Sequence, residues 1–174
     1  MYQNLDQSAF VKLMQEHQAL LHKVCNLYCV FPQDKEDLFQ EIVIQVWKSY
    51  PGFRGEAKFS TWLYRIALNT AISDLRKQKK RIVGADIGPF LPDGTPDSAD
   101  WEQEEQLRIL YSAIGQLTDV EKALVMLYLE DKSYDEMEEI LGINQNNLRV
   151  KMNRIKEKLR KLTKEEDGYG TGKP

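Results

Sequence analysis

The stretch that decides the fold is SYDEMEEILGINQNNLRVKMNRIKEK, residues 133–158. Apolar residues recur at helical spacing in its first part, and Gly142 then stands where a chain needs a left-handed residue to leave a helix. Asn144 is a suitable cap for a second, longer helix that keeps Leu148 and Met152 on one side. The pattern predicts a helix-turn-helix, with Ile143 filling the angle between the two helices. The first helix is expected to bury Met137, Ile140 and Leu141.

The second helix of this motif turns polar and basic side chains outward. The outward residues near its start are Asn146, Asn147, Arg149, Val150, Asn153 and Arg154. Asn pairs bidentately with adenine, Arg pairs with guanine, and Lys binds phosphates, so this face suits the groove of duplex DNA. The alternative is an ordinary surface helix with a solvated charged face. The turn, the helix caps and the position of the basic residues on one face of the second helix all favour a DNA-binding function.

Further helical signals lie before the motif and within it. A helix is expected from Trp101 to Ile114, followed by a second that opens on a capping box of Thr118 with Glu121. Ser133 with Glu136 makes another capping box at the start of the helix-turn-helix. The last helix is expected to carry one buried stripe, formed by Leu148, Met152, Ile155, Leu159 and Leu162.

The N-terminal part of the chain also has helical periodicity and no competing strand pattern. One amphipathic helix is expected from Phe10 to Tyr28, and a second from Leu38 to Tyr50, capped by Asp34 and stopped by Pro51-Gly52. A third helix is expected to begin with Ser60 or Thr61 as its cap and to run into the basic cluster at residues 76–81. These helices predict one helical domain.

Residues 83–100 interrupt the helical pattern, because they contain three glycines, three prolines and four aspartates but few apolar residues. The fold class is therefore all-α, with two small helical domains joined by a flexible linker. The expected divisions are a first domain at 1–82, the linker at 83–100, the helix-turn-helix domain at 101–163 and a disordered tail at 164–174. The distribution of charge follows the same division. Residues 1–81 hold 12 Lys and Arg against 8 Asp and Glu, whereas residues 82–132 hold 3 Lys and Arg against 11 Asp and Glu.

Composition excludes several classes of protein. With 42% apolar and 29% charged residues, no long apolar run and no basic N-terminal flank, the chain is predicted to be a cytoplasmic protein without a membrane span. Cys25 and Cys29 are too few for a disulfide framework. Together with His22 they share one side of a helix, so a metal or redox site is conceivable, but a fourth ligand is not evident and ordinary buried thiols are favoured.

Residues 53–70 interleave aromatic, basic and amide side chains across a loop and a helix start. Single-stranded nucleic acid is bound by aromatic side chains, on which unstacked bases lie, together with basic side chains that bind the phosphate backbone. On composition alone, Phe59 and Trp62 are better explained as core residues.

The chain resembles the extracytoplasmic-function (ECF) class of bacterial RNA polymerase sigma factors, in the sigma-70 family, from about residue 8 to residue 162. Three pieces in the family's order carry the resemblance. The first is DLFQE at 37–41 with Val46-Trp47, the second is FRG at 53–55 with FSTWLYRIA at 59–67 and Asn69, and the third is Ser133-Tyr134 through Leu141-Gly142-Ile143.

The resemblance implies a sigma factor that binds core RNA polymerase, recognises the −10 and −35 promoter elements and helps to open the duplex between them. The residues implied to bind polymerase are Asp37, Gln40, Glu41 and Gln45. The loop 53–60, with Phe53, Arg54 and Phe59 and with Asn69 behind it, is implied to capture an extruded base of the melted promoter. Backbone phosphates are assigned to Arg65, Arg76, Lys77, Lys79 and Lys80. The resemblance also makes an anti-sigma partner expected.

One position departs from the family pattern, because Glu138 stands where a small residue is usual, facing the second helix of the motif. Either this side chain leans outward along its aliphatic stem, or the angle between the two helices opens slightly.

Two other readings compete with a sigma factor. A free-standing helix-turn-helix regulator would use its N-terminal domain to sense a ligand or to dimerise. An enzyme is disfavoured because the sequence has no Gly-rich phosphate loop, no Ser/His/Asp set and no strong metal spacing. No catalytic residue, cofactor or metal is predicted.

Overall fold

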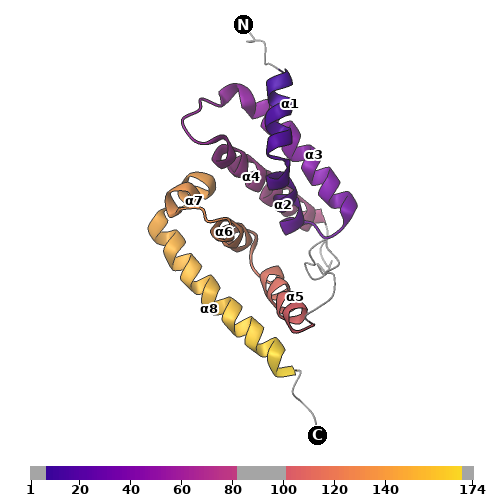
Figure 1. The fold of residues 1–174 in the computed structure, drawn as a ribbon, viewed down its shortest axis with the longest axis vertical. Coiled ribbons are helices and arrows are strands. Elements are labelled where there is room, and N and C mark those ends of the chain that lie inside the picture. Colours follow the sequence, from indigo (N-terminus) through magenta and orange to yellow (C-terminus); the bar gives the residue numbers. More distant parts are fainter. Residues whose placement is uncertain (1–6, 82–100, 170–174) are drawn as a thin grey trace. The chain divides into compact units, whose positions relative to one another are not determined.

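The computed structural model describes residues 7–81 and 101–169, and the regular elements in these ranges are all helices (Figure 1). The all-α fold class is therefore confirmed, while the expected linker at 83–100 lies outside the described residues. The chain forms two compact units, divided near residue 85. The first contains α1 (Gln7–Glu16), α2 (Gln18–Tyr28), α3 (Pro32–Ser49), the 3₁₀ turn η1 (Tyr50–Gly52) and α4 (Phe59–Arg81). The second contains α5 (Trp101–Gly115), α6 (Asp119–Leu129), most of α7 (Tyr134–Leu141) and α8 (Gln145–Tyr169).

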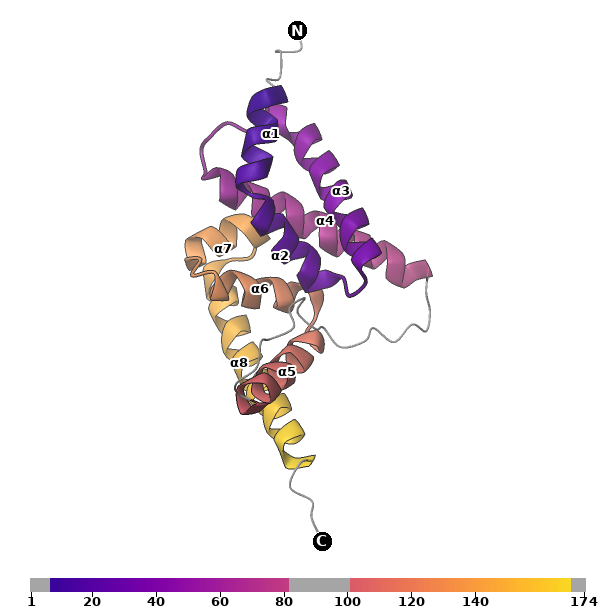
Figure 2. The same ribbon diagram turned by 45° about the vertical axis from the view of Figure 1, so that its right-hand side comes forward.

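The first unit is built on α2, α3 and α4, each of which packs against the other two (Figure 2). Their facing sides carry the apolar residues that the helical spacing predicts. The buried set consists of Leu21 and Val24 from α2, Leu38, Ile42 and Val46 from α3, and Leu63, Ala67 and Ala71 from α4. Helix α1 adds Phe10, whose ring lies edge-on to Trp47 and Tyr50 with centroid distances of 4.7 and 5.4 Å. This core holds α3 and α4 side by side. The faces of these two helices that do not carry the buried residues are open to solvent or to a partner.

The single N-terminal helix expected from Phe10 to Tyr28 is wrong, because the chain turns at His17 and forms α1 and α2. His17 has φ −113° and ψ 10°, outside the helical region. Its ring Nδ1 lies 2.9 Å from the Leu13 carbonyl oxygen, which also accepts the His17 backbone N–H at 3.2 Å. A side chain that bonds the preceding turn in this way competes with the regular helical ladder.

Two predicted helix starts are also wrong. Helix α3 begins at Pro32 with Phe31 in the cap position, and Asp34 lies inside its first turn instead of capping it. Proline suits a first helical position because its φ is already helical and its missing N–H would have no partner there. Helix α4 begins at Phe59, ahead of Ser60 and Thr61.

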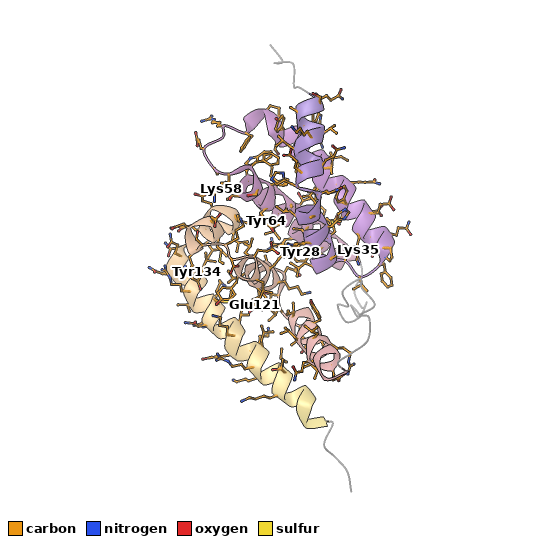
Figure 3. All side chains as sticks on the ribbon, in the orientation of Figure 1. Tyr28, Lys35, Lys58, Tyr64, Glu121 and Tyr134 are labelled. Carbon is orange, nitrogen blue, oxygen red and sulfur yellow. The ribbon has the colours of Figure 1, made fainter. Side chains whose placement is uncertain are left out.

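In the second unit, α5 and α6 both pack against α8. Both predicted capping boxes are confirmed. Thr118 Oγ1 accepts the Glu121 N–H at 3.3 Å while Glu121 Oε2 accepts the Thr118 N–H at 2.9 Å. The pair Ser133 and Glu136 repeats this exchange at 3.2 and 3.0 Å. Figure 3 labels Glu121 on α6 and Tyr134, which follows the second box at the start of α7.

Helix α8 is longer than its predicted extent, continuing past residue 163 to Tyr169. No glycine or proline interrupts this extension before Gly168, and the Thr163 hydroxyl bonds back to the Leu159 carbonyl oxygen at 3.0 Å. The expected stripe is fully buried only at Leu148, Met152 and Ile155, whereas Leu159 and Leu162 are half-buried. Helix α8 spans about 37 Å at ~1.5 Å per residue, and the fully buried residues described on it lie in its N-terminal half.

Candidate functional site

The turn between α7 and α8 has the predicted geometry. Gly142 closes α7 in the left-handed conformation, with φ 67° and ψ 24°, and its N–H bonds the Glu138 carbonyl oxygen at 2.8 Å. Asn144 caps α8, because its side-chain Oδ1 accepts the Asn146 N–H at 2.9 Å. Ile143 is half-buried. Glu138 is also half-buried.

The first turns of α8 expose the polar and basic face that the spacing predicts. Leu148 and Met152 are buried, with exposed fractions of 0 and 2%. Of the apolar side chains of α7, Met137 and Ile140 are buried but Leu141 is only half-buried. All six residues expected outward are exposed: Asn146, Asn147, Arg149, Val150, Asn153 and Arg154. An exposed helix face with amide and guanidinium groups near its N-terminus has the dimensions and donors for a major groove.

Two side chains of α7 that the sequence pattern did not single out hold this face. The Tyr134 ring lies under the Arg149 guanidinium, whose carbon is 5.0 Å from the ring centroid. The next residue, Asp135, accepts a hydrogen bond from the Gln145 amide at the start of α8. These partners are ten to fifteen residues apart in the sequence, so helical spacing within one helix does not reveal them.

The loop before α4 and the start of α4 gather three aromatic rings. Phe53 lies 5.5 Å from Phe59 and 4.9 Å from Trp62, and Phe59 lies 5.5 Å from Trp62, measured between centroids. All three are half-buried, so they are neither a closed core nor free surface rings. His17, which was not singled out for this site, places its ring edge against Phe59 at 5.0 Å. Arg54 is exposed within the loop.

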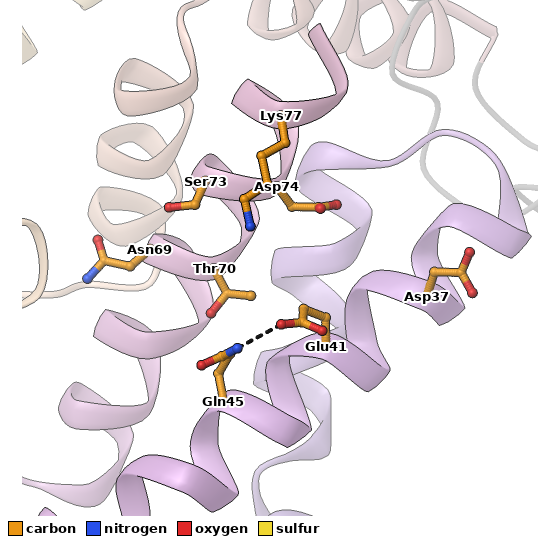
Figure 4. A pocket seen from close by; sticks show the side chains of 8 residues that line it. All are labelled: Asp37, Glu41, Gln45, Asn69, Thr70, Ser73, Asp74 and Lys77. Carbon is orange, nitrogen blue, oxygen red and sulfur yellow. Dashed lines mark hydrogen bonds between the residues drawn. The ribbon is translucent and has the colours of Figure 1, made fainter. Parts of the chain in front are cut away.

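A polar groove of about 600 Å³ runs between α3 and α4 (Figure 4). Three residues expected to bind polymerase line it, namely Asp37, Glu41 and Gln45, and the Gln45 amide donates to Glu41 Oε1 at 2.7 Å. The fourth, Gln40, is exposed on α3 but is not among the lining residues. The opposite wall comes from α4 and consists of Asn69, Thr70, Ser73, Asp74 and Lys77.

The groove therefore joins residues that were assigned to different partners. Asn69 and Lys77, both expected to bind DNA, share it with the expected polymerase-binding residues. Thr70, Ser73 and Asp74 were not predicted site residues. Their signal is a polar stripe on α4, since positions 70, 73, 74 and 77 recur at helical spacing. Arg65 and Arg76 are exposed elsewhere on α4, while the side chains of Lys79 and Lys80 lie outside the described residues.

Comparison with known proteins gives a consistent identity for both units. The model of sigma-70 region 2 matches residues 13–81, and that of sigma-70 region 4 matches residues 107–159. An ECF RNA polymerase sigma-E factor of Haemophilus influenzae is 32% identical over 163 residues, which cover 87% of this chain and 86% of that protein. This chain belongs to the ECF sigma factors. Another ECF sigma factor, SigW of Bacillus subtilis, is 28% identical over 167 residues, covering 90% of this chain and 89% of the relative.

Solved structures support the fold of this ECF sigma factor. One is the sigma factor RpoE of Bartonella quintana, crystallised with the anti-sigma factor NepR, with a TM-score of 0.68, 19% identity and coverage of 90% of this chain and 97% of that one. Another is CnrH in complex with the cytosolic domain of CnrY, with a TM-score of 0.64, 19% identity and coverage of 91% of this chain and 89% of that one.

As a sigma factor, the protein directs promoter-specific initiation by core RNA polymerase. Matches to both promoter-recognition regions leave the free-standing regulator disfavoured, because such a protein would not require region 2. Within the part of the chain that the structure describes, no helix is long and apolar enough to cross a membrane.

The two cysteines of this sigma factor have the character of ordinary packed thiols. Burial raises the pKa of Cys25 to about 12 and that of Cys29 to about 11. Both thiols are therefore protonated at neutral pH, whereas nucleophilic attack requires the thiolate. The His22 ring stacks on Phe39, with 4.8 Å between centroids. Among the described residues no group of three His, Cys, Asp or Glu side chains has metal-binding geometry.

Proposed function

We propose that the two units of this sigma factor divide promoter recognition, with the α1–α4 unit (residues 1–82) binding core polymerase and the melted −10 element, and the α5–α8 unit (residues 101–163) reading the −35 element as duplex. The observation that carries the proposal is the exposed face of α8 with its amide and guanidinium groups. This face follows a helix-turn-helix turn in which Gly142 ends α7 and Asn144 caps α8. In this proposal the chemistry of initiation stays with the polymerase.

The −35 element is read by the first turns of α8. Its exposed side chains include three amides and two guanidinium groups, which are the donors and acceptors that distinguish base pairs in the major groove. Arg149 lies in the second turn, where recognition helices contact base edges. The basic residues farther along α8, such as Lys151 and Arg154, are placed for phosphates, which position the helix without specifying sequence.

Arg149→Ala is expected to weaken promoter binding by the holoenzyme by roughly 1–3 kcal/mol and to relax the preference at one base of the −35 element. The physical reason is loss of a bidentate guanidinium contact to a guanine edge. Competition binding against a promoter library measures both effects. A loss of equal size on every sequence would show that Arg149 contacts a phosphate instead.

The −10 element is bound by the loop 53–59 and the aromatic cluster behind it, formed by Phe53, Phe59 and Trp62. Half-buried rings offer flat, sequence-tolerant surfaces on which an unstacked base can lie, while the exposed Arg54 and Arg65 supply charge for the backbone. We propose that the basic end of α4, from Arg76 to Lys80, holds the phosphates that follow.

Core polymerase is bound by the exposed side of α3, through Asp37, Gln40, Glu41 and Gln45. Packing is compatible with this assignment, because Leu38, Ile42 and Val46 turn into the core and the four proposed residues do not. Asp37 and Gln40 are exposed, whereas Glu41 and Gln45 are half-buried at the groove. Gln45 and Glu41 bond each other at 2.7 Å and present their remaining polar atoms at the groove.

Gln40→Ala combined with Glu41→Ala is expected to weaken polymerase binding by roughly 1–2 kcal/mol, which is about five- to thirty-fold in Kd. Stability should change by less than about 0.5 kcal/mol, because neither residue belongs to the core. Titration of labelled sigma factor with core polymerase, beside a melting curve, measures the two quantities. Glu16→Ala on α1 is the matched control for loss of an exposed acid. A sharply lowered Tm in the double variant would make these residues structural and would contradict the assignment.

We also propose that this sigma factor acts in the cytoplasm and is held inactive by an anti-sigma factor. Support comes from the two similar structures, one solved with the anti-sigma factor NepR and the other with the cytosolic domain of CnrY. The absence of a membrane-spanning helix among the described residues is compatible with this compartment.

A further inference from the structure

Arg149, the central donor of the exposed α8 face, is held on two sides by this chain. The Tyr134 ring lies against its guanidinium, with the central carbon 5.0 Å from the ring centroid. Its Nη1 also lies 3.5 Å from the Asn146 side-chain oxygen, one turn earlier on α8. An exposed arginine usually samples many rotamers, so two partners restrict where its N–H groups point.

The position of Tyr134 is itself fixed by the start of α7. Ser133 and Glu136 form the capping box on either side of it, and Lys132 Nζ lies 3.6 Å from Glu136 Oε1. Asp135 accepts a hydrogen bond from Gln145 and so ties the same turn to the start of α8. Tyr134 itself is half-buried.

Asn146 is fixed from the other side. Its backbone N–H bonds Asn144 Oδ1 at 2.9 Å, which places it in the capping turn of α8. Its side-chain oxygen is turned to Arg149, while its amide NH2 group remains available for other partners. Tyr134 and Asn146 thus frame one guanidinium between the two helices of the motif.

This arrangement has a chemical consequence for recognition. The Arg149 guanidinium lies over the Tyr134 ring, and its N–H donors that do not point to Asn146 remain available for another partner. Those donors match the O6 and N7 acceptors of guanine only in one orientation. A guanidinium fixed before binding loses less rotational freedom when the contact forms.

We propose that Tyr134 is a positioning residue for promoter specificity, which orients Arg149, with Asn146, for bidentate contact to one guanine of the −35 element. The inference rests on the proposed reading of that element by α8. Tyr134 acts through Arg149, so its contribution to base preference exists only while Arg149 is present.

The test measures base preference by the holoenzyme on a library in which each −35 position is varied. Tyr134→Leu removes the ring face and is expected to reduce discrimination by roughly two- to five-fold at the position that Arg149→Ala relaxes, and not elsewhere. Tyr134→Phe keeps the ring and is expected to restore the preference. The double variant Tyr134→Leu with Arg149→Ala should match Arg149→Ala alone.

Tyr128→Leu provides the matched control, because it removes another ring–cation pair, between Tyr128 on α6 and Lys156 on α8 at 4.4 Å. It should leave preference at the Arg149 position unchanged. The inference is overturned if Tyr134→Leu weakens all sequences equally, or if its effect adds to that of Arg149→Ala. A uniform loss for Arg149→Ala itself would instead contradict the proposed base readout by this residue, and the two failures are thereby distinguished.

Discussion

Ile42→Ala is expected to lower the free energy of unfolding of the α1–α4 unit by about 3 kcal/mol, within the ~2–5 kcal/mol typical of such core truncations. Ile42 lies at the middle of α3 with no exposed surface, and α3 packs against both α2 and α4. Removal of its side chain leaves a cavity that the surrounding helices can fill only in part. The total free energy of unfolding of a helical unit of about 80 residues is roughly 4–12 kcal/mol, so this loss is a large share of it.

The same helix supplies the control. Ile44 is 45% exposed on the opposite side of α3, and Ile44→Ala should change stability by less than about 0.5 kcal/mol, because a small loss of contact is offset by the better helix propensity of alanine. Urea unfolding followed by tryptophan fluorescence in a Trp101→Phe background reports on the first unit through Trp47 and Trp62. Equal losses for the two variants would mean that α3 does not pack through the face described.

The features predicted correctly from the sequence were those with a local cause. A capping box needs only a hydroxyl and a carboxylate three residues apart, so Thr118 with Glu121 and Ser133 with Glu136 were recognisable without knowledge of their surroundings. The same holds for Gly142, whose left-handed φ depends on its own missing Cβ. The exposed face of α8 followed from helical spacing alone.

The features missed depend on contacts between distant residues or on competition between two local signals. Helical spacing continues through His17, so periodicity gave no sign of the break between α1 and α2. At Pro32 and Asp34 two start signals compete, and the proline prevails. Glu41 was expected to bind polymerase and Asn69 to bind DNA, yet the two residues line one groove. The sequence could not show this, because it depends on how α3 packs beside α4.

Leu148→Ala is expected to destabilise the helix-turn-helix by about 3 kcal/mol and to abolish selective use of the −35 element. Leu148 is fully buried in the first turn of α8, one residue before Arg149. The unit that contains Leu148 spans roughly 60 residues, so its free energy of unfolding is about 3–9 kcal/mol. A loss of this size leaves a substantial unfolded fraction. Loss of recognition would then follow from loss of the surface that carries Arg149, and not from loss of a DNA contact.

Val150→Ala separates these causes, because Val150, two residues later, is 49% exposed and its truncation should change stability by less than about 0.5 kcal/mol. Amide hydrogen exchange resolved over residues 133–158 measures local stability, and initiation from promoters with intact or altered −35 elements measures recognition. Leu148→Ala should speed exchange across both helices of the motif, whereas Val150→Ala should leave exchange slow and alter only the preference among promoters. If Leu148→Ala keeps exchange slow but still loses recognition, the buried face of α8 has been assigned to the wrong side, and with it the reading face that carries Arg149.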